Sequence, residues 1–254
     1  MVTASRQPAR RCLAPVREAI IACERCPRLR AYCQRIAREK KRAHRDDTYW
    51  GRPVPGFGDP GARLLVLGLA PAAHGANRTG RVFTGDAPGG SGDFLMEAMH
   101  AHGFANQPFT RSIDDGLELH DAFIAATVRC APPQNKPTPE EIGHCTVHLD
   151  AELACLTQLR VVLALGRIAT GAFFSWLARP GALVRPRPAF AHGAIWVPSV
   201  SWPPAGASRR RPGHDVPALV MAYHPSRQNT NTGRLTQAML RDAFATARRM
   251  LDAT

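Results

Sequence analysis

The stretch Arg63-Leu-Leu-Val-Leu-Gly68 has the composition of a short strand that is apolar along its whole length. Four more apolar stretches of strand length follow it, at residues 122–128, 160–165, 194–197 and 218–222. Segments with helical patterns lie between and after them, at residues 91–103, 138–158, 167–178 and 234–251. Strands that are apolar on both faces must be covered on both faces. The pattern therefore predicts an α/β fold, a three-layer α/β/α sandwich with a central parallel sheet.

The N-terminal part of the chain differs from this alternation. Residues 1–11 are polar and basic, and we expect them to form a flexible tail. Residues 14–45 have a charged helical pattern that is interrupted at Cys23-Glu-Arg-Cys-Pro27, where the proline can open a second helix. We expect these helices to pack against the sandwich, so that residues 12–254 form a single domain. Glycine and proline make residues 51–62 a loop, and residues 201–217 form a long basic loop.

Charge points to the class of partner. The chain has 254 residues and a formal net charge of +13, with a pI of about 10.4. Such an excess of basic groups favours a polyanion, nucleic acid first and an acidic membrane second. The alternative is a basic surface of the kind found in organisms with arginine-rich proteins.

Hydropathy indicates the compartment. The chain has no apolar run as long as the roughly 18 residues of a transmembrane helix, and Met1 to Arg11 lack the apolar stretch of a signal peptide. We therefore expect a cytoplasmic protein without a membrane partner. In a reducing compartment, its seven cysteines are expected to be metal ligands or buried thiols rather than disulfides.

Four of the cysteines form two distant pairs. Cys23 and Cys26 make a CxxC motif, and Cys130 and Cys145 lie far downstream. Soft thiolates select zinc or an iron–sulfur cluster, and the spacing alone does not separate the two. Buried thiols without a metal are the third possibility. Cys12, Cys33 and Cys155 are left over, and Cys155 lies on an apolar helical stretch that suggests the core.

Three unusual loops follow strands of the predicted sheet. The first is Gly68 to Asp86, whose small residues let a ligand approach the backbone and which carries Phe83 as a stacking face and Asp86 as a carboxylate. The second, residues 131–137, contains Asn135, and the third runs from His224 to Gly233. Phe83 could instead be a core residue, Asp86 a helix cap and His224 a strand-end histidine. Ligands bind at the carboxyl ends of parallel strands, so the convergence of all three loops there favours a binding site.

These loops and the four cysteines together resemble the uracil-DNA glycosylase superfamily. The sequence GLAPA at 68–72 with GRVFTGD at 80–86 is similar to the first motif of that superfamily, and HPSRQNTNTGRLT at 224–236 is similar to its third. The match is close to the family 5 branch and covers about residues 20–245. The resemblance implies a 4Fe–4S cluster on Cys23, Cys26, Cys130 and Cys145. It also implies a monofunctional glycosylase that flips uracil out of DNA, hydrolyses its N-glycosidic bond and so initiates base excision repair.

The resemblance assigns roles to loop residues. Gly68, Ala70, Phe83 and Asn135 would bind the flipped base, with Phe83 stacking on it and Asn135 meeting its edge. His224 would stabilise the charge that grows on O2 of the base. Contacts to DNA would come from Arg227, Gln228, Asn229 and Thr230.

One departure from other branches of the superfamily concerns how the water for the hydrolysis is positioned. Those branches carry an acidic or amide side chain beside the first-motif proline, where this chain has Leu69 and Ala70. Asp86 is then the candidate for holding the water, and the alternative is that electrostatic stabilisation of the leaving base and the cationic sugar lowers most of the barrier. The less polar pocket edge suggests that hypoxanthine or other damaged bases are also accepted.

The resulting expectation is a monomeric uracil-DNA glycosylase whose partner is single- or double-stranded DNA with a damaged base. The arginine and lysine side chains between Arg28 and Arg45, and Arg209 to Arg211, would contact phosphates. The alternative function is a non-catalytic, metal-stabilised DNA-binding module. Such a module would account for the charge and the cysteines but not for three polar loops at one sheet edge.

Overall fold

The computed structural model describes residues 6–85, 88–178, 187–198 and 216–253. Its centre is a six-stranded sheet with the strand order β1-β3-β2-β4-β6-β5. The four central strands run parallel, and every one of their residues is buried: β2 (Leu64–Gly68), β3 (Ala122–Ala126), β4 (Val161–Leu165) and β6 (Ala218–Ala222). This confirms the prediction of an α/β fold built on a parallel sheet of fully apolar strands.

The two edge strands depart from the prediction. β1 (Phe57–Gly58) pairs antiparallel with β3, and β5 (Ile195–Trp196) pairs antiparallel with β6. The expectation of a loop throughout residues 51–62 was therefore wrong at β1, and the sheet is mixed at its edges. A two-residue strand between prolines carries no periodic signal in the sequence. At Gly58 a side-chain Cβ would lie 2.4 Å from the Ala122 carbonyl oxygen, so this pairing requires glycine.

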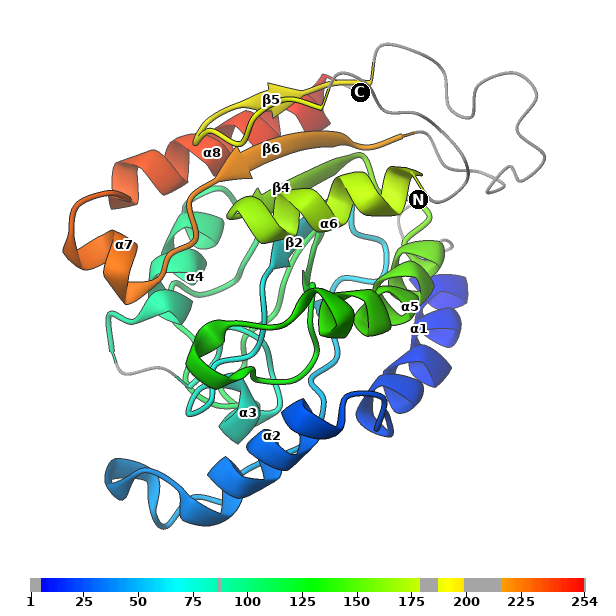
Figure 1. Ribbon diagram of the computed structural model, residues 1–254. Helices are drawn as coiled ribbons and strands as arrows, with labels where there is room; N and C mark the ends of the chain where they lie inside the picture. Colours follow the sequence, from blue (N-terminus) through cyan, green and yellow to red (C-terminus); the bar gives the residue numbers. More distant parts are fainter. Residues whose placement is uncertain (1–5, 86–87, 179–186, 199–215, 254) are drawn as a thin grey trace.

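Four helices cover the two faces of the sheet (Figure 1). α4 (Ser91–Ala101) and α8 (Gln237–Asp252) pack with Leu64 and Val66 on one face, while α5 (Pro139–Cys155) and α6 (Arg167–Ala178) pack with Leu65 and Leu67 on the other. Successive strand residues point to opposite faces, so each central strand contributes to both apolar layers. All four helices were predicted, and each layer buries its apolar side against the sheet.

Two further helices form the N-terminal part. α1 (Arg6–Ile21) places Ala9, Leu13, Val16 and Ile20 on one side and lies against α5. α2 (Pro27–Glu39) begins at the proline that the sequence indicated, because proline is tolerated in the first turn. Residues 6–11 belong to α1, so the expected flexible tail was wrong there. Buried Ala9 continues the apolar spacing of α1 into this stretch, and that spacing is the signal for helix.

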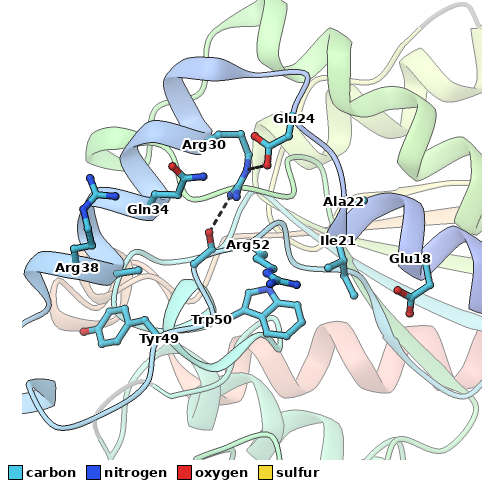
Figure 2. A pocket seen from close by; sticks show the side chains of 12 residues that line it. Glu18, Ile21, Ala22, Glu24, Arg30, Gln34, Arg38, Tyr49, Trp50 and Arg52 are labelled. Atoms are coloured by element: carbon cyan, nitrogen blue, oxygen red, sulfur yellow. Dashed lines mark hydrogen bonds and ion pairs between the residues drawn. The ribbon is translucent and has the colours of Figure 1, made fainter.

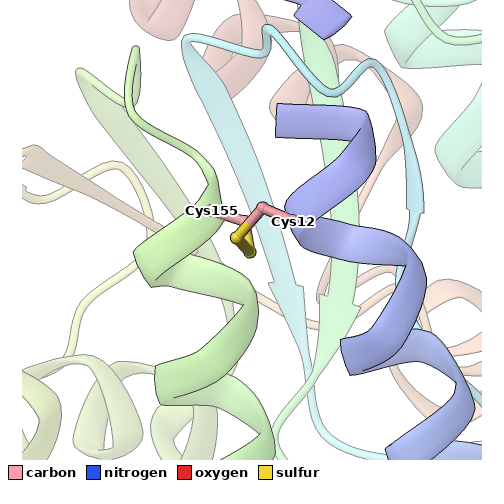
Figure 3. Close-up of a disulfide and its surroundings, with 2 residues drawn as sticks. All are labelled: Cys12 and Cys155. Carbon is pink, nitrogen blue, oxygen red and sulfur yellow. A yellow bond between two sulfur atoms is a disulfide. The ribbon is translucent and has the colours of Figure 1, made fainter. Parts of the chain in front are cut away.

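A disulfide joins α1 to α5. Cys12 and Cys155 are bonded, with their Cα atoms 5.5 Å apart (Figure 3). The expectation that these cysteines would be thiols was wrong, although Cys155 is buried as expected. The two residues are 143 positions apart, and no local pattern in the sequence brings them together. The bond closes a covalent loop that contains Cys23, Cys26, Cys130 and Cys145.

Short elements connect these layers and shape the loops: η1 (Arg42–His44), α3 (Ala76–Thr79), η2 (Pro133–Asn135) and α7 (Arg227–Asn231). Most of the predicted basic loop at 201–217, including Arg209 to Arg211, lies outside the described residues. None of the helices in the described ranges has the length and apolar character needed to cross a membrane.

Candidate functional site

A cavity of about 560 Å³ opens where β2, β3 and β6 end. Its walls come from the three loops that the sequence singled out. The predicted base-binding and catalytic residues that line it are Gly68, Ala70, Phe83, Asn135 and His224, and the predicted DNA contacts that line it are Arg227 and Gln228. The convergence of the three loops at one sheet edge is therefore confirmed. Asp86, the predicted water-holding residue, lies outside the described residues.

Phe83 forms one wall of the cavity in an unusual backbone conformation. Its φ of 53° lies in the left-handed region, where a bulky residue is strained. Two glycines make room for it. A Cβ at Gly92 would lie 2.2 Å from the Phe83 carbonyl oxygen, and a Cβ at Gly68 would lie 3.0 Å from the Phe83 ring. The ring is thereby held at the carboxyl end of β2, and backbone strain of this kind tends to occur at functional sites.

A buried polar network supports the Phe83 loop from behind. Nη2 of Arg81 pairs with both carboxylate oxygens of Asp115, at 2.7 and 2.8 Å, and Nε of Arg81 donates to the Thr84 hydroxyl at 2.9 Å. Thr84 and Thr110 share a hydrogen bond of 2.7 Å. Arg81 and Asp115 are each 7% exposed as side chains, so the pair is nearly dry. The motif contains Arg81, but its partner Asp115 lies in a loop where no sequence pattern marked it.

Asn135 stands on the opposite wall in a tight turn. Both Gln134 and Asn135 have positive φ values, 55° and 57°. Asparagine tolerates this conformation better than most residues because its short polar side chain can hydrogen-bond locally. The Asn135 amide side chain is exposed at the cavity wall, and within the described part of the chain it has no recorded hydrogen-bond partner. Lys136, the next residue, also lines the cavity and brings a positive charge that the sequence reasoning did not assign.

His224 follows β6 and faces Phe83. The two rings are stacked, with centroids 5.6 Å apart and an angle of 27° between their planes. The surrounding wall removes water from the ring, and this desolvation lowers the pKa of His224 to about 4. Although part of the residue's surface still faces the cavity, the low pKa leaves the imidazole neutral near pH 7.

Asn229 and Ser226 fix the backbone of His224. The Asn229 side-chain amide and the Ser226 backbone N–H both donate to the His224 carbonyl oxygen at 2.8 Å. Ser226 also caps α7, and the Thr230 hydroxyl donates back to the Ser226 carbonyl oxygen at 3.2 Å. Of the four predicted DNA contacts, Arg227 and Gln228 are exposed at the cavity rim, while the side chains of Asn229 and Thr230 hydrogen-bond within their own loop.

Five free cysteines lie in the part of the chain next to this site. Cys26, Cys33, Cys130 and Cys145 are buried in one cluster, and Cys23 is half-buried. Burial, together with the neighbouring Cys145, Glu141 and Cys23, raises the pKa of Cys26 to about 11. The pKa of Cys130 is raised by the Cys33 thiol and by burial. Three of the four predicted ligands, Cys26, Cys130 and Cys145, therefore lie in one buried cluster, and Cys23 raises the pKa values of Cys26 and Cys145.

The same region contains a charged group with unmet hydrogen bonds. Arg129 is 1% exposed and pairs through one nitrogen with Glu152 at 2.6 Å. Its Nε and Nη1 atoms have no hydrogen-bond partner among the described residues. Burial raises the pKa of the Cys145 thiol, and the Arg129 backbone N–H and charge offset part of that rise. Within the described ranges, no three histidine, cysteine or acidic side chains come close enough to hold a single metal ion.

Two basic residues of the predicted phosphate-binding helix have partners inside the protein. Arg28 pairs with Glu141 at 2.7 Å. Arg30 is buried, pairs with Glu24 at 3.1 Å and donates to the Gly51 carbonyl oxygen. The positive charge of these two side chains is therefore used to hold α2 in place.

Comparison with known proteins gives a consistent result. The family model of the Uracil DNA glycosylase superfamily matches residues 55–248. The chain is 46% identical to the type-5 uracil-DNA glycosylase of Thermus thermophilus over 233 residues, which cover 92% of this chain and 95% of that protein. It is 45% identical to the type-5 enzyme of Mycobacterium tuberculosis, over 91% of this chain and 79% of that protein. A type-4 uracil-DNA glycosylase of Archaeoglobus fulgidus is 33% identical over 48% of this chain and 52% of that protein.

The long matches are to type-5 proteins, and the type-4 match covers about half of the chain. The chain therefore belongs to the uracil-DNA glycosylase superfamily and, within it, to the type-5 uracil-DNA glycosylases.

Proposed function

We propose that this protein is a monofunctional uracil-DNA glycosylase that flips uracil out of DNA and hydrolyses its N-glycosidic bond. The observation that carries the proposal is one cavity with Phe83, Asn135 and His224 on its walls. The relatives named type-5 uracil-DNA glycosylase support it. A base inside a duplex cannot reach such a cavity, so the nucleotide must leave the stack. The abasic site that remains is the starting point of base excision repair.

The cavity walls match the parts of a flipped base. The Phe83 ring offers a flat apolar face for stacking. The Asn135 side chain has both an amide donor and a carbonyl acceptor, which complement the N3–H and O4 edge of uracil. The small residues Gly68 and Ala70 leave the backbone accessible to the base.

His224 acts where negative charge develops. As the C1′–N1 bond breaks, its electron pair moves into the uracil ring and increases the charge on O2. A neutral imidazole N–H can donate a hydrogen bond to that oxygen without giving up a proton. The lowered pKa of His224 supports this role, because the ring does not have to lose a proton first near pH 7. The hydrogen bonds from Asn229 and Ser226 to its backbone would hold the ring in position.

The role of accepting a proton from the attacking water is assigned to Asp86. The oxygen of a water molecule bonds to C1′ while the C1′–N1 bond breaks, and the water must lose a proton to a base. Leu69 and Ala70 line the cavity but have no group that accepts a proton. Asp86, three residues beyond Phe83, is the carboxylate we propose for that step. Hypoxanthine and other damaged bases are proposed as further substrates, because Ala70, Ala72 and Gly75 give the wall little bulk.

A 4Fe–4S cluster held by Cys23, Cys26, Cys130 and Cys145 is part of the proposal. Burial of three of these thiols together and the unmet donors of buried Arg129 both suit an anionic group in this region. A cluster is larger than an ion, so its ligands need not converge as closely as zinc ligands do. When bound, the cluster would join four thiolates and tie the start of α2 to the segment after β3 and to α5.

Contacts to DNA are proposed for Arg227, Gln228, Asn229 and Thr230, beside the mouth of the cavity. Arg227 and Gln228 would reach the DNA with their side chains, while Asn229 and Thr230 would act mainly by shaping the loop. We also propose that the protein works as a monomer, since a cavity formed by one chain needs no second copy. The compartment that we propose for it is the cytoplasm.

The test is incubation with an end-labelled duplex that contains one uracil, followed by alkali. We expect strand cleavage at the uracil only after alkali, because a monofunctional glycosylase leaves the sugar–phosphate backbone intact. A matched duplex with thymine at that position is the control. Cleavage without alkali would contradict the monofunctional assignment, and the absence of cleavage would contradict the glycosylase assignment.

A further inference from the structure

A second cavity lies next to the first-motif loop, which also lines the base cavity. Its volume is about 650 Å³, within the range of roughly 300–1,000 Å³ that is usual for ligand sites. Figure 2 shows side chains of α2, among them Arg30 and Arg38, opposite Tyr49, Trp50 and Arg52 of the segment that follows η1. No part of the proposed reaction uses these residues.

The segment from Tyr49 to Gly51 connects the two cavities. The backbone N–H of Trp50 donates to the Arg78 carbonyl oxygen at 2.8 Å, and the backbone N–H of Gly51 donates to the Asn77 backbone carbonyl oxygen at 3.0 Å. The Tyr49 hydroxyl lies 3.1 Å from the His74 ring nitrogen Nδ1. Ala70, Ala72, Gly75 and Ala76 of the same loop line the base cavity. A DNA strand that leaves the flipped nucleotide would cross this loop to reach the second cavity.

Two exposed cationic side chains line the second cavity. Arg38 and Arg52 are exposed along its wall and make no recorded ion pair with a carboxylate in the described ranges. Arg30 is buried, and its charge is already compensated by Glu24 at 3.1 Å. Glu18 lies at the α1 end of the cavity, away from Arg38 (Figure 2). An anionic ligand would therefore lie between Arg38 and Arg52.

An aromatic surface lies beside Arg52 (Figure 2). The Trp50 ring rests on Gly80, where a Cβ would lie 2.9 Å from the indole. Its Nε1–H donates to the Pro53 carbonyl oxygen at 3.1 Å, which fixes the ring. Trp50 is only half-buried and lines the cavity, so part of the indole stays accessible. A fixed aromatic ring and two exposed guanidinium groups in one cavity are the combination that binds single-stranded nucleic acid.

We propose that this cavity binds one nucleotide of single-stranded DNA that flanks the lesion, with its base against Trp50 and its phosphates near Arg38 and Arg52. The inference rests on the proposed function for the identity of the DNA. A duplex is too wide to fit into a cavity of about 650 Å³, whereas a single unpaired nucleotide can fit. The site would strengthen binding of uracil in single-stranded or frayed DNA without taking part in bond cleavage.

The test measures Kd by fluorescence anisotropy for two substrates that each contain one uracil: a blunt duplex and the same duplex with single-stranded extensions. The variant is Arg38→Gln/Arg52→Gln, and the matched control is Arg17→Gln/Arg249→Gln, which removes two exposed arginines outside the cavity. We expect the variant to bind the extended substrate roughly tenfold more weakly, with the slope of log Kd against log salt reduced by about 1.4, from about 0.7 per phosphate contact. Its Kd for the blunt duplex should match that of the control.

Trp50→Leu is the second variant, and its melting temperature is measured to check that it still folds. A loss of roughly fivefold or more in affinity for the extended substrate is expected from the missing stack. Equal Kd values and salt slopes for the wild type and the double variant would overturn the proposal, as would an equal loss on both substrates. Uracil excision by the wild type is recorded in parallel, so that failure of the proposed function and failure of this site are told apart.

Discussion

At the scale of single residues, the most specific chemical prediction concerns the pKa of His224. Its imidazole has a pKa near 4 in the folded protein, against 6.5 for an ordinary histidine, because the cavity wall removes water from the ring. The unfolded chain therefore binds more protons than the folded chain between those two pH values. The contribution of His224 to stability is fully present above pH 6.5 and is lost as the pH falls towards 4.

The pKa of His224 predicts the pH dependence of excision. We expect the His224 contribution to kcat/KM to stay constant from neutral pH down to about pH 5 and to fall as the ring is protonated near pH 4. An NMR titration of the ring protons, assigned with His224→Gln, measures the pKa directly. A midpoint at 6.5 or above would contradict a desolvated, neutral imidazole.

Asp86 is the second prediction at this scale. Asp86→Ala should lower the single-turnover excision rate by roughly 100-fold, the usual contribution of a general base. DNA binding, measured by anisotropy, should be unchanged. Asp114→Ala, which removes an exposed carboxylate from another loop, is the control. A near-normal rate for Asp86→Ala would assign the catalysis to electrostatic stabilisation of the leaving base.

The sequence predicted the residues that line the cavity better than the residues that hold them in place. Phe83, Asn135 and His224 lie in long polar or glycine-rich loops after strands, and parallel strands bring their carboxyl ends together. Asp115 and Asn229 support the site through hydrogen bonds to particular atoms, and no periodic pattern encodes those contacts.

At the scale of elements, the cysteine-bearing segments are predicted to depend on the cluster. Cys23→Ser and Cys145→Ser should lower the iron content, the visible absorbance and the soluble yield, because each removes one proposed ligand. Cys33→Ser is the matched control, since Cys33 is buried in the same cluster but is outside the ligand set. Iron loss in Cys33→Ser equal to that in Cys145→Ser would contradict the assignment of ligands.

The disulfide between α1 and α5 makes a separate prediction. Cys12→Ser should lower the melting temperature, because a cross-link between residues 143 positions apart restricts the unfolded chain. Such cross-links typically stabilise by about 2–4 kcal/mol. A reducing agent should lower the melting temperature of the wild type and leave that of Cys12→Ser unchanged. Equal melting temperatures of the two proteins under oxidising conditions would show that the bond contributes nothing.

Elements with a long apolar pattern were predictable, and short or covalently linked ones were not. The four central strands and the helices α4, α5, α6 and α8 each have a pattern that spans the whole element. β1 has two residues and follows from its pairing with β3, and Cys12 meets Cys155 only because α1 lies on α5. These features depend on tertiary contacts, which a local pattern does not encode.

At the scale of the whole molecule, the loop from Gly68 to Gly80 connects the two cavities to the helix that carries Cys33. The loop from Gly68 to Gly80 contributes to the base cavity and contacts Trp50 of the second cavity. Asn77, in α3, donates to the Cys33 carbonyl oxygen at 3.3 Å and so connects this loop to α2. The N-terminal helices are therefore joined directly to the loop that forms the proposed active site.

The central claim is that the base cavity excises uracil. Its most direct test is the single-turnover release of free uracil from a duplex with one uracil, compared between the wild type, His224→Ala and the control His120→Ala, an exposed histidine outside the cavity. We predict that the wild type and His120→Ala release uracil at similar rates. His224→Ala should be slower by roughly 100- to 1,000-fold, the usual effect of losing one donor to a developing oxyanion, with unchanged DNA binding. Equal rates for His224→Ala and the wild type, or no release of uracil by the wild type, would contradict the claim.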